Sequence, residues 1–414
     1  MEPHDVDKFA KGAAPDSGQA WLRLGASILV STIGGVGMWS VVVALPAVQA
    51  EFGVPRAEAS LPFTLAMLGF AFGGVLMGRL LDIAGILGPV SLGAVMLGVG
   101  YLGAASAGSL TTFALAHAVI GFGSSVSLGP LMADISHWFV RRRGLAITLC
   151  SAGNYLAGTV WPPLVQRSIA LHGWRATHLG IGLACGIAML AVGFIALRQR
   201  SPAAAQQATE VGMRSPGTLG TLGLSPNMLQ ALLAIASVCC CVAMSMPQVH
   251  IVAYCGDLGY GVAHGADMLA VMMACGILGR IGSGVIADHI GGLRTLMLGS
   301  ALQGVALLLY LLYDGLVSLY VISAVFGLFQ GGIVPSYALI IREYLPPKEA
   351  GTRVGIVLMA SLFGMALGGW MSGYIFDVTG SYGAAFVNGL GWNAVNASIV
   401  LWILFRRRSR MAYA

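Results

Sequence analysis

One arginine of this sequence lies deep in an apolar segment, where a permanent charge is costly. Arg280 falls within the stretch 264–287, eight residues before Asp288, so a helix would carry it roughly 12 Å inward at ~1.5 Å per residue. An arginine at the centre of a membrane helix costs at least ~2.5–3.5 kcal/mol and therefore faces a cavity or a partner. Positions 276 and 284, one turn away, are glycines and not acids. An unpaired guanidinium favours a carboxylate ligand; a structural ion pair or snorkelling to the interface is the alternative.

Four further polar residues lie in apolar segments and are candidates for contact with a substrate. His250, after Pro247, could titrate, because histidine changes charge near neutral pH; a neutral ring bonded to a backbone carbonyl is the alternative. Asn154 lies at a depth comparable with Arg280, and its amide could donate a hydrogen bond. Gln330 and Tyr337 could do the same. For all three, a hydrogen bond between helices is the competing interpretation.

Catalytic and cofactor-binding patterns do not fit this chain. The run Gly98–Gly103 matches a dinucleotide-binding fingerprint, but it lies inside an apolar segment and follows no strand. No P-loop, HExxH or G-x-S-x-G pattern is present. All seven cysteines fall in apolar segments without a CxxC pair, so we expect no metal or redox site. The chain is therefore expected to be neither an enzyme nor dependent on a cofactor.

The composition is that of a protein that lies mostly in lipid. Of the 414 residues, 57% are hydrophobic and only 9% are charged, whereas soluble domains carry about 25% charged residues. Twelve apolar runs are each close to the ~20 residues that cross ~30 Å of hydrocarbon. They are continuous and not alternating, so they indicate α-helices and not a β-barrel. The predicted spans are 22–47, 60–80, 87–107, 111–136, 143–169, 175–197, 228–256, 264–287, 293–313, 316–342, 352–375 and 383–405.

Between the sixth and seventh runs the apolar pattern stops. The segment 199–227 contains Pro202 and Pro216 and lacks apolar periodicity, which is typical of a linker. We therefore predict an N-terminal tail (1–21), a six-helix bundle (22–198), a linker (199–227), a second six-helix bundle (228–406) and a C-terminal tail (407–414).

The distribution of basic residues predicts the orientation. With both termini in the cytoplasm, all 22 Lys and Arg residues lie on the inner side except Arg56, Arg167, Arg175 and Arg280. The net charge of +6 is explained by this bias, and no basic stripe with interleaved aromatics suggests nucleic-acid binding. We expect a multi-pass protein of a cell membrane, with a bacterial inner membrane as the first expectation.

Two correspondences indicate that the halves are repeats. Gly78–Gly85 and Gly284–Gly291 both have the pattern G-x-x-x-D-x-x-G, at an offset of 206 residues, and both close a predicted span. Gly153 corresponds to Gly364 at an offset of 211, in the fifth and eleventh spans. Duplicated halves that rock about a site at the midplane are how secondary transporters alternate access.

At these residues the chain resembles the major facilitator superfamily, whose signature G-x-x-x-D-x-x-G lies between spans two and three. The resemblance implies an all-α membrane protein of twelve transmembrane helices in two pseudo-symmetric six-helix bundles. It also implies a cytoplasmic gating role for Asp82, which would interact with Arg79 and Arg353. By symmetry Asp288 would pair with the cluster Arg141–Arg143 or with the N-terminal dipole of span five. The usual basic residues after Asp82 are replaced by apolar ones, so the interactions of Asp82 at the cytoplasmic gate are expected to be weaker than in the family.

A narrower resemblance lies in Trp138–Gly153, which is similar to the span-five signature of the monocarboxylate transporter family; Gly34–Trp39 partly echoes another motif of that family. The related oxalate/formate exchangers share much of it. Both groups use an arginine in span eight, which implies that Arg280 binds substrate. The classical acidic proton carrier four residues earlier is absent, because position 276 is glycine. Oxalate exchangers have a second basic residue in span eleven, whereas Val354–Tyr374 contains none, which favours a monoanion.

These inferences combine into one hypothesis about function. We expect a proton-coupled symporter of lactate- or pyruvate-like monocarboxylates that works as a monomer in the lipid bilayer. Its substrate-binding candidates are Arg280, His250, Asn154, Gln330 and Tyr337. Exchange of oxalate for formate is the alternative within transport, and a non-transporting membrane sensor is the alternative from a different class.

Overall fold

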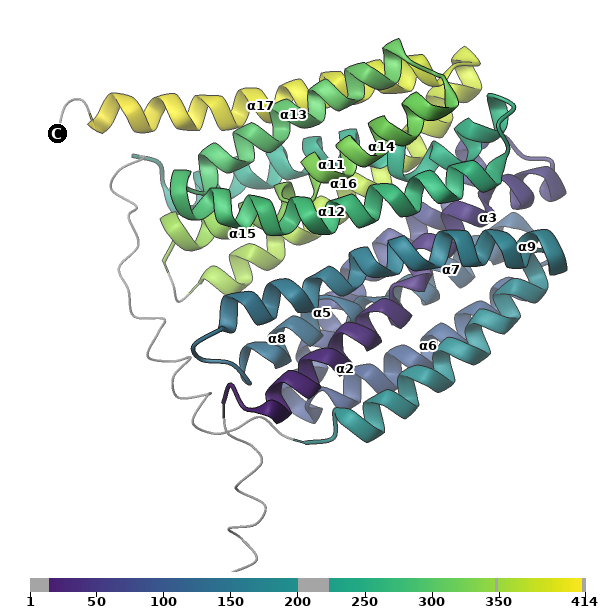
Figure 1. The fold of residues 1–414 in the computed structure, drawn as a ribbon, viewed down its shortest axis with the longest axis horizontal. Coiled ribbons are helices and arrows are strands. Elements are labelled where there is room, and N and C mark those ends of the chain that lie inside the picture. The colour runs from purple at the N-terminus through teal and green to yellow at the C-terminus, as the bar shows by residue number, and fades with distance from the viewer. Residues whose placement is uncertain (1–14, 200–222, 347–348, 412–414) are drawn as a thin grey trace, which may run out of the picture.

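The computed structural model describes residues 15–199, 223–346 and 349–411. Every regular element in these ranges is a helix, and they contain no strand (Figure 1). Of the predicted tails and linker, residues 1–14, 200–222 and 412–414 lie outside the described residues. Helices are favoured because lipid offers no hydrogen-bond partner to backbone groups, so each span must satisfy its own.

Each half of the chain folds into a bundle, and the two bundles lie side by side (Figure 1). The first contains α2 (Gly18–Gly34), α3 (Val36–Phe52), α4 (Arg56–Ala59), α5 (Leu61–Ala84), α6 (Leu87–Ala105), α7 (Leu110–Ser124), the 3₁₀ turn η1 (Ser125–Ser127), α8 (Gly129–Ser136) and α9 (Arg143–Ala196). The second contains α11 (Pro226–Asp257), α12 (Val262–Ile290), α13 (Gly292–Leu312), α14 (Leu316–Gln330), α15 (Ile333–Tyr344), α16 (Ala350–Thr379) and α17 (Tyr382–Met411).

The count of membrane spans agrees with the prediction. Eleven segments of the described chain are long and apolar enough to cross a membrane. One of them, α9, has 54 residues and turns at Gly173, whose φ of 77° and ψ of 164° are not helical, so it supplies two spans. Glycine is needed there because other residues rarely adopt positive φ. The predicted fold class, twelve helices in two six-helix bundles, is confirmed.

Several boundaries differ from the predicted ones. The first span begins at Gly18, inside the predicted tail, and α17 continues through Arg406 to Met411. Three spans that the sequence predicts as continuous are interrupted: between α2 and α3 at Gly35, at η1, and between α14 and α15. Hydropathy does not detect these changes because the interrupting residues are small or apolar and fit an apolar run.

The repeated glycines occupy equivalent contacts in the two bundles. A Cβ on Gly153 would lie 2.7 Å from the Cβ of Ser31 and 3.0 Å from a carbonyl oxygen, so the first part of α9 packs closely on α2. A Cβ on Gly364 would lie 2.9 Å from the Cβ of Cys241 and 2.6 Å from a carbonyl oxygen, so α16 packs equally closely on α11. The correspondence between the two halves therefore reflects helix pairs that only small residues allow.

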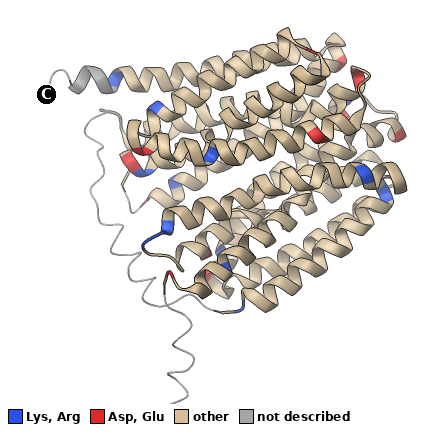
Figure 2. Cartoon of the chain, viewed as in Figure 1, with Lys and Arg blue, Asp and Glu red and all other residues tan. Residues whose placement is uncertain are grey.

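The two ends of the bundles are distinguished by which parts of the chain lie there, the termini or the turns between helices. We call the end with Gly18 and Arg406 the termini end, and the end with the turns at Gly53, Gly259 and Gly380 the far end. Charged residues gather mainly at these two ends, and the middle is almost free of them (Figure 2). This separation is expected of helices whose central portions lie in hydrocarbon.

At the termini end, Asp16 connects the start of α2 to the loop before α9. Its carboxylate accepts hydrogen bonds from the backbone N–H groups of Val140, Arg141 and Arg142, at 3.1, 3.0 and 3.3 Å. Partial desolvation of the carboxylate opposes ionisation, but the hydrogen bonds from Arg141, Val140 and Arg142 outweigh it and lower the pKa of Asp16. The loop that carries the predicted basic cluster is thus anchored within its own bundle.

Candidate functional site

Arg280 lies on α12 at the boundary between the two bundles. Its Nη1 donates to the Oγ of Ser151, 2.8 Å away, and its Nε lies 3.4 Å from the carbonyl oxygen of Gly331. Its guanidinium carbon is 4.6 Å from the centroid of the Tyr155 ring, within the range of a cation–π interaction. Ser151 and Tyr155 are one turn apart on α9, so half-buried Arg280 connects one bundle with the other.

No carboxylate neutralises Arg280 within the described part of the chain. There, nitrogen and oxygen atoms within 4.0 Å of each other join Arg23 to Asp134, Arg56 to Asp257, Arg175 to Glu51 and Arg353 to Glu349. Arg280 is instead held by the hydroxyl of Ser151, by two carbonyl oxygens and by an aromatic ring. None of these cancels its charge, which stays available to an anion.

Glycines bring α14 against α12 beside this arginine. A Cβ on Gly279 would lie 1.9 Å from a carbonyl oxygen of α14, and one on Gly327 would lie 1.9 Å from a carbonyl oxygen of α12. The helix then breaks after Gln330. The carbonyl of Gly331 has no helical donor, because position 335 is a proline and lacks an N–H group. Close packing and a free carbonyl together explain the contact with Arg280.

The sequence did not identify Ser151 or Tyr155 as contacts of Arg280. It selected their neighbour Asn154, whose Nδ2 instead lies 3.5 Å from the Sδ of Met38. The expected depth pointed to the correct part of α9, but rotation about the helix axis decides which side chain meets α12. The spacing of four residues between Ser151 and Tyr155 is the signal that could have indicated a shared face.

Gln330 and Tyr337 make hydrogen bonds inside the second bundle. The Oε1 of Gln330 accepts from the Nε2 of Gln248 at 2.6 Å, and the hydroxyl of Tyr337 donates to the Oδ1 of Asn396 at 2.8 Å. Both side chains are completely buried. Their observed contacts are the helix–helix hydrogen bonds that the sequence offered as the alternative, and the structure does not bring them into contact with Arg280.

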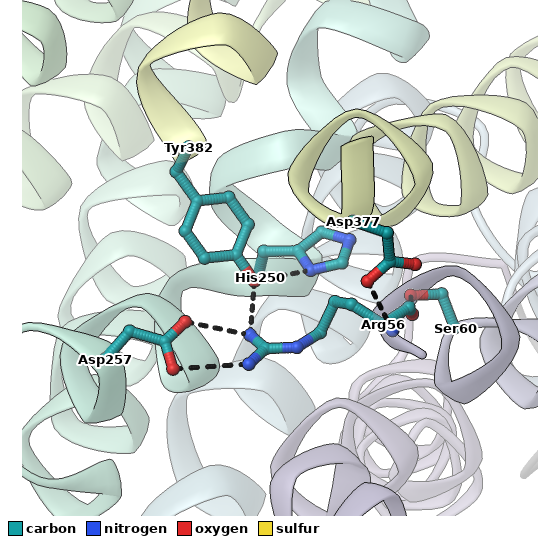
Figure 3. A network of polar contacts seen from close by, with 6 residues as sticks. All are labelled: Arg56, Ser60, His250, Asp257, Asp377 and Tyr382. Carbon is teal, nitrogen blue, oxygen red and sulfur yellow. Dashed lines mark hydrogen bonds and ion pairs between the residues drawn. The ribbon is translucent and has the colours of Figure 1, made fainter. Parts of the chain in front are cut away.

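Towards the far end, five residues form a second polar cluster, the Arg56 network (Figure 3). Its members are Arg56 of α4, His250 and Asp257 of α11, Asp377 of α16 and Tyr382 of α17. The guanidinium of Arg56 binds the two carboxylate oxygens of Asp257 at 3.1 and 3.2 Å and donates to the hydroxyl of Tyr382 at 2.5 Å. The network therefore links the first bundle to three helices of the second.

Asp377 and His250 complete the Arg56 network. The carboxylate of Asp377 accepts from the backbone N–H groups of Arg56 and Ala57, at 2.8 and 2.7 Å, at the start of α4. The ring of His250 is fully buried, with Nδ1 3.2 Å from the hydroxyl of Tyr382 and Nε2 2.8 Å from the carbonyl oxygen of Gly369. His250 thus lies among the far-end residues and has no hydrogen bond to Arg280 or its contacts. The sequence treated Arg56 as a loop charge and missed this network.

The predicted gating pairs at the termini end are not formed. Asp82, Arg79 and Asp288 are exposed, and we find no hydrogen bond or ion pair to any of them in residues 15–199, 223–346 and 349–411. Arg353 binds Glu349, the residue just before α16, at 2.7 Å, and not Asp82. The expected Asp82–Arg353 pair is absent in this conformation, where a nearer carboxylate at the start of α16 binds Arg353, and the gating role stays a prediction.

Arg143, the third gating arginine, does not pair with Asp288 either. It lies at the start of α9 and interacts electrostatically with Arg342 of α15, which has the same charge. A positive side chain of each bundle is thus within electrostatic range of the other at the termini end. Like charges disfavour close approach, so these two arginines do not help to hold the bundles together at this end.

Known proteins share both the sequence pattern and the fold. The family model of the Major Facilitator Superfamily matches residues 28–322 and 283–413. Monocarboxylate transporter 13 of Bos taurus is 28% identical over 376 residues, covering 90% of this chain and 86% of the relative. Monocarboxylate transporter 13 of Rattus norvegicus is 30% identical over 307 residues, covering 73% and 70%.

Two solved transporters have the same arrangement of helices. A bacterial homologue of the human lysosomal transporter Spinster, in an inward-facing and occupied conformation, matches with a TM-score of 0.70 at 14% identity, over 94% of this chain and 95% of its own. A variant of the nucleoside transporter NupG matches with a TM-score of 0.72 at 16% identity, over 92% and 99%. The protein is a transporter and not an enzyme, and the chain belongs to the Major Facilitator Superfamily, in its monocarboxylate transporter-like family.

Proposed function

We propose that this transporter carries small monocarboxylates, such as lactate or pyruvate, together with a proton, by alternating access. The observation that carries the proposal is Arg280, a fixed positive charge at the boundary between the bundles without a carboxylate partner among the described residues. A site at this boundary is what rocking halves need. The relatives named monocarboxylate transporters support an organic acid as substrate.

The contacts of Arg280 suit a single carboxylate. The hydroxyl of Ser151 accepts from Nη1 while its own hydrogen is donated to the carbonyl of Thr148 at 2.8 Å, so it orients the guanidinium and stays neutral. The ring of Tyr155 covers one face of the guanidinium. A carboxylate binds in the plane of the guanidinium, and its one charge matches the one charge of Arg280. The absence of a basic residue in Val354–Tyr374 supports a monoanion over oxalate.

We further propose that the termini face the cytoplasm of a cell, where the excess of Lys and Arg is expected. The Arg56 network then lies on the outer side and joins the bundles there, together with a hydrogen bond of 3.1 Å from Thr64 to the carbonyl of Ala366. The like-charged Arg143 and Arg342 repel each other on the inner side. These contacts support a state that is closed to the outside.

The test is uptake of labelled lactate into proteoliposomes under an inward proton gradient. We expect Arg280→Ala to reduce binding and uptake about 10- to 100-fold, because a charged hydrogen-bonded contact is worth ~1.5–3 kcal/mol. Arg280→Lys should retain part of the activity. Arg167→Ala is the matched control, since Arg167 is exposed near the far end. Full uptake by Arg280→Ala would refute the site, and indifference to the gradient would remove the proton from the mechanism.

A competition arm separates the alternative of oxalate–formate exchange. Unlabelled pyruvate should suppress lactate uptake, and oxalate should compete at least about ten times more weakly, because the second charge of a dianion would have no cation to neutralise it. Oxalate that competes as well as pyruvate and drives counterflow of formate would favour the exchanger.

A further inference from the structure

His250 has a defined hydrogen-bonding role in the Arg56 network. Its Nε2 lies 2.8 Å from the carbonyl oxygen of Gly369, which can only accept, so Nε2 carries the ring hydrogen. In a neutral ring Nδ1 is then an acceptor, and its partner at 3.2 Å is the hydroxyl of Tyr382. That hydroxyl donates to His250 while its oxygen accepts from Nη1 of Arg56 at 2.5 Å. Each hydrogen bond in the series from Gly369 through His250 and Tyr382 to Arg56 therefore has one donor and one acceptor.

Protonation of His250 at Nδ1 would remove the match between donors and acceptors in the Arg56 network. The protonated ring donates from both nitrogens, so Tyr382 loses its acceptor, and its oxygen faces two donors, Arg56 and His250. The ring would also become a buried cation, since its exposed fraction is 0%. A buried charge is stable only when paired and hydrogen-bonded. Both effects disfavour the protonated ring while the Arg56 network is closed.

The charges around His250 do not provide a direct counter-ion. Arg56 on α4, which shares the Tyr382 hydroxyl with His250, is positive. Asp257, on the same helix as His250, is already bound to Arg56 through both oxygens. Asp377 on α16 is exposed and is bound to two backbone N–H groups. A protonated His250 would therefore be better solvated once the bundles separate at the far end.

We propose that His250 is a proton-binding site that controls the outer gate: a proton taken from the outside adds to Nδ1, releases the Tyr382–Arg56 contact and favours the outward-open state. The proposal rests on the proposed transport function, because it names where an external proton acts in that cycle. By linkage, a proton that binds the open state more tightly shifts the population towards it. Opening should therefore increase below about pH 6.5, the ordinary pKa of histidine.

The experiment measures opening without any substrate. The side chain of Thr64 donates across the boundary to Ala366, and a Thr64→Cys variant places a thiol there. Intact cells are treated with a membrane-impermeant maleimide at external pH 5.5 to 8. Gly108→Cys, at an exposed far-end turn where a side chain meets nothing within 4 Å, serves as the reference for thiol reactivity at each pH. The ratio of labelling at position 64 to labelling at position 108 reports opening, and the parent protein corrects for the native cysteines.

Three variants define the outcome. With His250 present, the ratio should rise several-fold from pH 8 to pH 5.5; His250→Gln, which keeps a donor and an acceptor but cannot titrate, should give a flat profile. Asp257→Asn should give a high ratio at every pH, because it weakens the pair with Arg56. Glu51→Gln is the matched control, since its far-end pair with Arg175 lies within one bundle, and it should behave as the parent.

A flat profile with His250 present, or an unchanged rise in His250→Gln, would overturn the proposal. If His250→Gln does not reach the membrane, Tyr382→Phe supplies the second test: it removes the hydroxyl between His250 and Arg56 and should raise the ratio at pH 8 and flatten the profile. Because no carboxylate substrate is added, this result is independent of Arg280. Failure of the parent to take up lactate would instead contradict the proposed function, and it would not affect the conclusion about His250.

Discussion

The ring of Tyr155 occupies the space into which a side chain at Gly276 would extend. A Cβ built on Gly276 would lie 2.5 Å from Cε1 of that ring, closer than real Cβ atoms come to other atoms. Tyr155 is on α9 and Gly276 on α12, so the pair also sets the distance between the bundles beside Arg280. The glycine that replaces the acid of the classical monocarboxylate transporter pattern therefore makes room for an aromatic ring.

We predict that Gly276→Asp impairs both stability and binding. The new side chain must displace Tyr155, which costs about 1–3 kcal/mol as overpacking, and its carboxylate would pair with Arg280 one turn away and compete with substrate. Thermal unfolding with and without lactate measures both effects. Gly276→Asp combined with Tyr155→Ala should recover stability but not binding. Ligand-induced stabilisation of the single variant equal to that of the parent would show that the contact is unimportant.

The role of the Tyr155 ring is tested by two substitutions. Tyr155→Phe keeps a ring over the guanidinium and should change lactate affinity less than about threefold. Tyr155→Ala removes a cation–π contact worth ~0.5–2 kcal/mol and should weaken affinity about 2- to 30-fold. Asn154→Ala is the comparison, because its side chain contacts Met38 and should matter less. If Asn154→Ala weakens lactate binding more than Tyr155→Ala does in a titration, Asn154 and not Tyr155 contacts the substrate.

Two ion pairs of the first bundle should differ in their contribution to stability. Arg23 and Asp134 are buried and bound through two hydrogen bonds of 2.8 and 3.0 Å. Asp134→Asn leaves a buried guanidinium without its counter-ion and should cost about 3–5 kcal/mol. Arg175 and Glu51 are exposed, and Glu51→Gln should cost less than about 1 kcal/mol. Thermal unfolding in the same detergent compares them, and equal losses would contradict this distinction.

The packing of α12 on α14 predicts a contrast between two glycines of the same helix. Gly279→Ala places a Cβ 1.9 Å from a backbone carbonyl oxygen, which cannot move without its helix. We therefore expect the free energy of unfolding to fall by ~3 kcal/mol and Gly331 to move away from Arg280. Gly284→Ala meets nothing within 4 Å and should be neutral. Unfolding temperature and lactate affinity should fall together for Gly279→Ala alone; parallel behaviour of the two variants would refute the argument.

The twelve spans, the repeat and the one arginine in the middle of the membrane could all be predicted from the order of the amino acids. The spans follow from the length of each apolar run compared with the thickness of the hydrocarbon layer. The arginine follows from the cost of an isolated charge in that layer. Glycines 153 and 364 could be matched because duplicated helix pairs need small residues at the same contact.

Which side chains meet depends on tertiary packing. Arg56 and Asp257 are 201 residues apart, and in the sequence each is one more charge at the end of a span. Ser151 and Tyr155 contact Arg280, and Asn154 does not, because the rotation of α9 about its axis is set by packing and not by hydropathy. The conformational state was equally beyond the sequence, since the Arg56 network at the far end and the unpaired Asp82 and Asp288 at the termini end, in the described residues, depend on how the two bundles are tilted.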